Sequence, residues 1–100
     1  MKKRVLLDTP DLLFRSKLTA VVAAGDAELS RDEAASDLVV IELGDARAID
    51  RIGQLVERGL TVLAYGAHVR PELLRAARDA GAVAVPNSQV EARLRALLTS

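Results

Sequence analysis

Two carboxylates, Asp8 and Glu42, each follow directly on a short apolar run of the chain. Runs of this kind, bounded by charged or turn residues, are typical of strands buried in a parallel sheet. Parallel strands bring their carboxyl ends to one edge, where sites of open α/β sheets lie. If the two carboxylates converge to about 4–6 Å, they repel by several kcal/mol at an effective dielectric of about 20. A bound cation, one shared proton, or a nearby cation such as His68 or Arg15 could relieve that repulsion.

Further polar residues follow two other apolar runs and complete the candidate site. The segment Tyr65–His68 comes after one run, and Pro86–Ser88 comes after the last. Tyr65 could shape a partner surface or pack at the end of its strand. His68 could sense pH or contact phosphate, or it could be a surface or capping residue.

The composition excludes several kinds of chemistry. The chain of 100 residues has no Cys and a single His, which rules out disulfides, thiolate chemistry and multi-histidine or Cys-based zinc sites. Neither a dinucleotide-binding glycine pattern nor a Walker pattern is present. The formal net charge is zero, with one Phe, one Tyr and no Trp. We therefore expect no binding to nucleic acid or to anionic membranes.

The first residues, Met1–Arg4, are basic and precede an apolar run, as in the first part of a signal peptide. Asp8 interrupts that run far short of a signal core. No apolar stretch approaches the roughly 20 residues of a membrane span. We expect a soluble, cytoplasmic protein.

The apolar runs alternate with helical patterns. Four strands are expected at residues 5–7, 38–41, 60–64 and 82–85, with a weaker one at 27–29 that suits a sheet edge. Apolar residues at helical spacing predict helices over residues 10–24, 47–58, 71–80 and 89–98.

The ends of these helices have recognisable signals. Thr9 or Asp8 could cap the first helix, and Ser88 with Glu91 has the spacing of a capping box for the last. Glycines at positions 25, 59 and 81 follow three of the helices and should end them.

The alternation of strands and helices predicts an α/β fold, a three-layer, doubly wound parallel sheet in one domain over residues 1–100. The link over residues 30–36 is short and holds at most about two helical turns. A full helix is therefore not expected between the second and third strands, where the helix should be short or missing.

Three segments of the chain resemble the receiver domain of bacterial response regulators. Arg4–Asp8 is similar to the first receiver strand and its acidic corner, and Asp37–Leu43 to the third strand, which in the family ends in the phosphoacceptor Asp. Ala80–Ala82 is similar to the Ala-Gly-Ala before the fifth strand. The resemblance covers essentially the whole chain and implies five parallel strands in the order 2-1-3-4-5.

Receivers transfer phosphate to Asp with Mg²⁺ held by a carboxylate pair, together with a Thr or Ser and a Lys on neighbouring strand ends. Asp8 keeps one acidic position in this sequence. The other positions of the pocket are changed, and they fall on Thr9, Glu42, Gly66 and Ser88. The resemblance therefore implies a degenerate phosphoacceptor pocket, in which only Asp8 and Glu42 could ligate Mg²⁺.

These departures favour a stand-alone pseudo-receiver, which is not an enzyme and acts by binding a partner protein or a second copy of itself. Glu42 could mimic a phosphorylated Asp, ligate a metal, or be a polar strand end in water. Two alternatives remain: a phosphoacceptor using Asp8, Asp11 or Asp45, and a domain that binds a small molecule or nucleotide at the strand ends.

Overall fold

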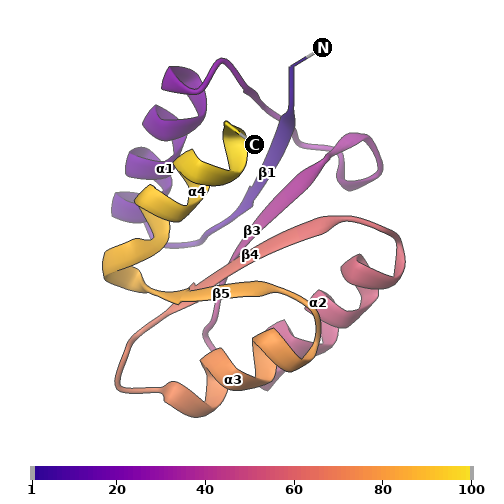
Figure 1. Cartoon of the computed structure of the whole chain (residues 1–100), viewed down its shortest axis with the longest axis vertical. Helices are drawn as coiled ribbons and strands as arrows, with labels where there is room; N and C mark the ends of the chain where they lie inside the picture. Colours follow the sequence, from indigo (N-terminus) through magenta and orange to yellow (C-terminus); the bar gives the residue numbers. More distant parts are fainter. Residues whose placement is uncertain (1, 100) are drawn as a thin grey trace.

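A five-stranded parallel sheet forms the middle layer of the molecule (Figure 1). The computed structural model describes residues 2–99, so Met1 and Ser100, the ends of the expected domain, lie outside it. The strand order is β2-β1-β3-β4-β5, which confirms the predicted order 2-1-3-4-5. The strands are β1 (Arg4–Asp8), β2 (Glu28–Leu29), β3 (Leu38–Glu42), β4 (Thr61–Gly66) and β5 (Val83–Pro86). The weak strand expected at a sheet edge is β2, which has two residues.

Two pairs of helices cover the two faces of the sheet (Figure 1). On one face lie α1 (Leu12–Ala24) and α4 (Val90–Leu98), and on the other lie α2 (Ala46–Glu57) and α3 (Pro71–Asp79). Side chains along each strand alternate between these faces. Val40 and Tyr65 accordingly belong to the core beneath α1 and α4, whereas Ile41 and Ala64 belong to the core beneath α2 and α3. This confirms the predicted three-layer fold.

The link between β2 and β3 contains a single 3₁₀ turn, η1 (Glu33–Ala35), in place of a full helix. Asp32 caps this turn by accepting the Ala34 N–H at 3.0 Å. The hydroxyls of Ser30 and Ser36, both buried, donate to the Asp32 carbonyl. The link is therefore an ordered structure, and it agrees with the prediction of a short or missing second helix.

The predicted caps of the first and last helices are wrong. Asp11 caps α1 by accepting the Leu13 and Phe14 N–H groups, and the candidates Thr9 and Asp8 remain extended. The helix begins at Leu12, two residues after Pro10, so the side chain of Asp11 and not that of Thr9 or Asp8 reaches the first free N–H groups.

At the last helix, Ser88 lies inside a 3₁₀ turn, η2 (Asn87–Gln89). The helix α4 therefore begins at Val90, two residues beyond Ser88, and no side-chain hydrogen bond caps it. The expected capping box of Ser88 and Glu91 does not form, because the extra turn removes Ser88 from the cap position.

Within residues 2–99, no helix has both the length and the apolar character that crossing a membrane requires.

The predicted helix ends at glycines 25, 59 and 81 are confirmed.

Gly81 is constrained twice, by its backbone angle and by its neighbour. Its φ is +105°, a left-handed conformation that favours glycine. A Cβ atom at this position would also lie 2.9 Å from Cγ1 of Val56 on α2. The turn after α3 therefore packs against α2 only because the side chain is absent.

We expect Gly81→Ala to lower the free energy of unfolding by roughly 2–4 kcal/mol, because backbone strain and overpacking add. Gly53→Ala is the matched control, since Gly53 lies inside α2 and a Cβ there meets nothing within 4 Å. The control should gain about 0.5–1 kcal/mol from helix propensity. Urea unfolding followed by far-UV circular dichroism measures both, and equal effects of the two substitutions would contradict this account.

Candidate functional site

The candidate site lies at the edge of the sheet where the parallel strands end. Backbone register places Asp8 beside Ile41, Glu42 beside Tyr65, and Gly66 beside Pro86. A hollow of about 190 Å³, here called the strand-end hollow, opens at this edge. Its lining residues are Asp11, Phe14, Glu42, Leu43, Tyr65, Gly66, Ala67 and Asn87.

Asp8 is engaged by a cation from α2. Arg51 Nε donates to Asp8 Oδ2 at 2.9 Å, and Arg51 Nη2 lies 2.9 Å from Oε1 of Glu33 in η1. Burial alone would lower the pKa of the Arg51 guanidinium, but its hydrogen bonds to Asp8 and Glu33 raise it. Arg51 therefore neutralises Asp8 and ties the β2–β3 link to α2.

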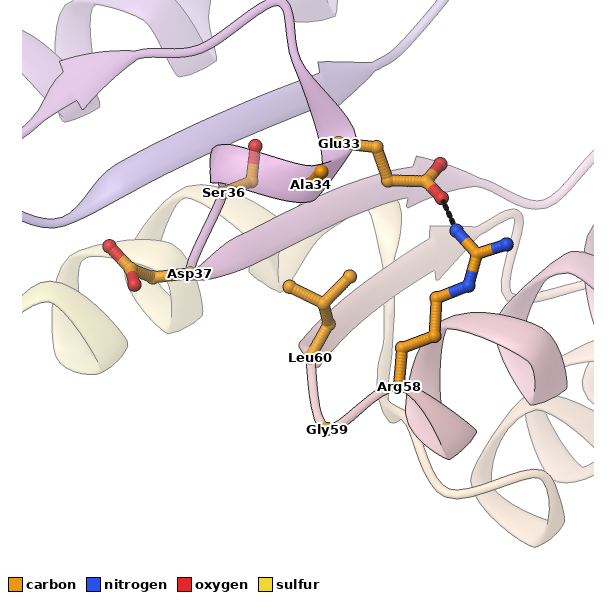
Figure 2. A pocket seen from close by; sticks show the side chains of 7 residues that line it. All are labelled: Glu33, Ala34, Ser36, Asp37, Arg58, Gly59 and Leu60. Carbon is orange, nitrogen blue, oxygen red and sulfur yellow. Dashed lines mark hydrogen bonds and ion pairs between the residues drawn. The ribbon is translucent and has the colours of Figure 1, made fainter.

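Glu33 extends this network to a second arginine. Arg58, at the end of α2, donates through Nη1 to Oε2 of Glu33 (Figure 2). The result is a chain of ion pairs, Asp8–Arg51–Glu33–Arg58, which runs along α2 beside the short link. This ion-pair chain connects the link to α2 where a full second helix is missing.

The Glu33–Arg58 pair also borders a larger hollow of about 340 Å³ (Figure 2). This hollow is lined in part by Asp37 and Leu60, which directly precede β3 and β4. It therefore lies at the opposite edge of the sheet from the strand ends. Asp37 accepts the Arg4 backbone N–H at 2.9 Å, and Glu33 is paired with two arginines. The two acidic side chains that line this larger hollow therefore already have partners within the protein. The strand-end hollow is the better candidate for a functional site.

Glu42 is held by a different set of partners from Asp8. The Tyr65 hydroxyl donates to Glu42 Oε1 at 3.1 Å, and the Asp11 backbone N–H approaches the same oxygen at 3.4 Å. Tyr65 is 1% exposed, and its ring lies 5.1 Å from that of Phe14. Glu42 is thus fixed to the side of the sheet that α1 covers.

The pKa of the Tyr65 phenol is raised well above its usual value of 10.0. Burial is the main cause, because it penalises the phenolate. The negative charge of Glu42 and the hydrogen bond to it act in the same direction, whereas the nearby Thr9 hydroxyl opposes them. Tyr65 therefore stays protonated and remains a donor to Glu42.

Asp8 and Glu42 do not share one pocket. Asp8 follows Leu7, which faces the α1 and α4 core, so Asp8 points to the opposite face, where Arg51 meets it. Glu42 follows Ile41, which faces the α2 and α3 core, so Glu42 points towards Tyr65. Each carboxylate has its own partners, and the expected repulsion between them is avoided by geometry.

The cation beside Asp8 is not one that the sequence suggested. Arg15 Nη1 donates to the Leu7 carbonyl at 3.0 Å, and His68 lies exposed in the turn after β4. Arg51 takes the role instead. In the sequence, the only signal for Arg51 is its position next to the apolar stripe of α2. Its second partner, Glu33, lies in an irregular link whose position beside α2 the sequence does not predict.

Of the other residues of the expected phosphoacceptor pocket, Thr9, Gly66 and Ser88, only Gly66 lines the strand-end hollow. Thr9 is 4% exposed, and its hydroxyl makes no hydrogen bond of acceptable geometry in the described part of the chain. Gly66 lines the hollow, where a Cβ would lie 3.2 Å from Leu43 Cβ. Ser88 is exposed in η2 and does not line the hollow, whereas its neighbour Asn87 does.

Two of the three alternative phosphoacceptors, Asp11 and Asp45, cap helices. Asp11 caps α1, as described above, and Asp45 caps α2 by accepting the Arg47 N–H at 2.9 Å. This hydrogen bond, together with the Arg47 guanidinium, holds the pKa of Asp45 below its usual range. Among residues 2–99, no group of three or more His, Cys, Asp or Glu side chains is placed to hold a metal ion.

Comparison with known proteins identifies the fold. No family model matches the sequence, and no curated protein matches it significantly. Solved structures do match over nearly all of both chains. A response regulator from Thermotoga maritima has a TM-score of 0.80 at 14% identity, with both chains covered completely. A CheY-like protein (tadZ) from Pseudomonas aeruginosa PAO1 has a TM-score of 0.76 at 19% identity, with 98% of each chain covered.

A third match is HP1043, an orphan response regulator of H. pylori, with a TM-score of 0.71 at 16% identity. It covers 97% of this chain and 91% of that one. The chain therefore has the receiver-like, CheY-like fold, as the sequence resemblance implied.

The single tyrosine allows a direct test of the Glu42–Tyr65 contact. We expect the native phenol to remain protonated as the pH rises past 10, and to ionise only when the protein unfolds. Because the folded-state pKa is the higher one, this contribution to stability is complete below the unfolded-state pKa of about 10 and is lost above it.

Absorbance of the phenolate against pH, with circular dichroism in parallel, measures this. Glu42→Gln should lower the pKa of Tyr65, because it removes the adjacent negative charge, while burial keeps the pKa above that of the urea-unfolded control. Ionisation of the native phenol near its ordinary pKa, with the fold intact, would contradict the buried contact.

Proposed function

We propose that this chain is a pseudo-receiver, a regulatory module that uses the receiver-like fold for protein–protein contact and is not phosphorylated at Glu42. The observation that carries the proposal is the separate engagement of the two carboxylates. Asp8 is paired with Arg51 on one face of the sheet, and Glu42 is bound to Tyr65 on the other.

Phosphoryl transfer from a phosphodonor to a carboxylate needs the leaving group and the acceptor in line, with Mg²⁺ and other cations that neutralise the developing charge. A metal at Asp8 would have to displace Arg51 from a 2.9 Å contact. The residue next to Asp8 is Thr9, which supplies no carboxylate. Ser88, the residue expected to replace the receiver Lys, lies outside the hollow. These features support a scaffold without phosphotransfer.

The two alternatives receive less support. Of the other carboxylates, Asp11 and Asp45 cap helices and Asp8 is ion-paired, so phosphorylation of any of them would break a native contact. A nucleotide would bring phosphates into a hollow whose lining includes Asp11 and Glu42 and no basic side chain. Like charges disfavour that complex.

Mass spectrometry of the intact protein after incubation with acetyl phosphate and Mg²⁺ tests the proposal. We expect no adduct of one phosphoryl group (about 80 Da) on the wild type. Glu42→Asp should also remain unmodified, because restoring the shorter acid restores neither the metal site nor the missing cation. A phosphorylatable receiver domain treated in parallel verifies the reagent.

A stoichiometric phosphoryl adduct on the wild type would overturn the proposal. Fragment masses would then assign it to Asp8, Asp11 or Asp45, and the matching Asp→Asn variant would lose it. A cytoplasmic location, the absence of enzymatic activity and the absence of nucleic-acid binding stay predictions of the sequence.

A further inference from the structure

Large apolar side chains are exposed beside the strand-end hollow. Leu12 and Leu13, in the first turn of α1, are 80% and 63% exposed, and Val69, in the loop after β4, is 69% exposed. All three lie within two residues of a side chain that lines the hollow: Asp11 and Phe14 flank the leucines, and Ala67 precedes the valine. We call these three residues the apolar rim. Exposed apolar groups beside a hollow are typical of interaction surfaces.

The hollow inside this rim is lined by two carboxylates that accept hydrogen bonds but form no ion pair within the described residues. Asp11 and Glu42 line it, and no Lys, Arg or His does. Neither carboxylate has an ion-pair partner within residues 2–99, in contrast to Asp8 with Arg51. Lys17 is the basic residue placed over Phe14, with its ammonium 5.7 Å from the ring centroid, and it pairs with neither acid.

A further unsatisfied group lies on the same face of the sheet as Glu42. Thr9 extends β1 by one residue and faces the α1 side, where its buried hydroxyl has no well-formed hydrogen bond in the described part of the chain. Tyr65 lies beside Thr9. Its hydroxyl donates to Glu42 Oε1, the same oxygen that the Asp11 N–H approaches. The lining of the hollow therefore offers carboxylate and phenol oxygens and no basic side chain.

We propose that the strand-end hollow and its apolar rim bind a lysine or arginine side chain, carried on an apolar segment of a partner protein. The partner's cation meets Glu42 and Asp11, while its apolar residues cover Leu12, Leu13 and Val69. The proposal rests on the proposed function, since it gives the surface and the kind of partner through which this module acts. Charge complementarity selects this occupant over an acidic segment or a nucleic acid.

A random dodecapeptide library displayed on phage, selected on immobilised wild-type protein, tests the proposal. We expect the enriched peptides to carry one Lys or Arg between apolar residues. The best peptide is then synthesised with a fluorophore, and its dissociation constant is measured by anisotropy. Replacing its basic residue with Gln should weaken binding about tenfold or more, and binding should weaken with salt.

Matched variants place the contact on the protein. Glu42→Gln and the double variant Leu12→Ser/Leu13→Ser should each weaken binding about tenfold. Glu57→Gln, an exposed acid at the end of α2, and Leu29→Ser, an exposed leucine on β2, are controls that should leave binding unchanged. Circular dichroism of each variant verifies the fold.

The inference would be overturned if the selection enriched acidic peptides or purely apolar peptides, or if it enriched no peptide at all. Equal loss of binding in the controls would overturn it too. A dimer of the free protein that dissociates in Leu12→Ser/Leu13→Ser would show that a second copy occupies the rim instead. None of these results concerns phosphorylation, so the inference can fail while the pseudo-receiver proposal stands.

Discussion

The alternation of side chains along β1 and β3 determines which face of the sheet each acidic side chain at its carboxyl edge occupies. The register sets Asp8 beside Ile41, one position before Glu42, so the two acids leave the sheet on opposite faces. Asp8 meets Arg51 on α2, and Glu42 meets Tyr65 under α1. A receiver pocket needs its acids gathered around one metal, and here the backbone that builds the fold also keeps them apart.

Arg51 joins this local constraint to the rest of the fold. Its guanidinium contacts both Asp8 at a strand end and Glu33 in the 3₁₀ turn, and Glu33 in turn accepts from Arg58. Pairs that are partly exposed contribute modestly, about 1 kcal/mol or less each, although a network holds its members in a fixed geometry. The short β2–β3 link is thereby attached to α2, and Asp8 has a cationic partner within the protein itself.

Sequence reasoning predicted most of the fold because its signals are local. Apolar runs defined β1, β3, β4 and β5, and glycines ended three helices at the predicted positions. The cap of α1 was missed because the helix begins at Leu12, two residues after its predicted start, and the cap of α4 was missed because a 3₁₀ turn at Ser88 intervenes. Arg51 could not be found, since its pairing with Asp8 and Glu33 depends on tertiary contacts across many residues.

The strand-end hollow follows from the same geometry. Glu42 has no ion-pair partner within residues 2–99, and its hydrogen-bond partners Tyr65 and Asp11 hold it in the hollow beside the apolar rim. A double-mutant cycle between Asp8→Asn and Glu42→Gln, measured by urea unfolding, tests the separation of the two acids most directly. Separate engagement predicts additivity within about 0.5 kcal/mol. Acids converging to about 5 Å would instead couple by roughly 3 kcal/mol at an effective dielectric of about 20, and a coupling above about 1 kcal/mol would contradict this account.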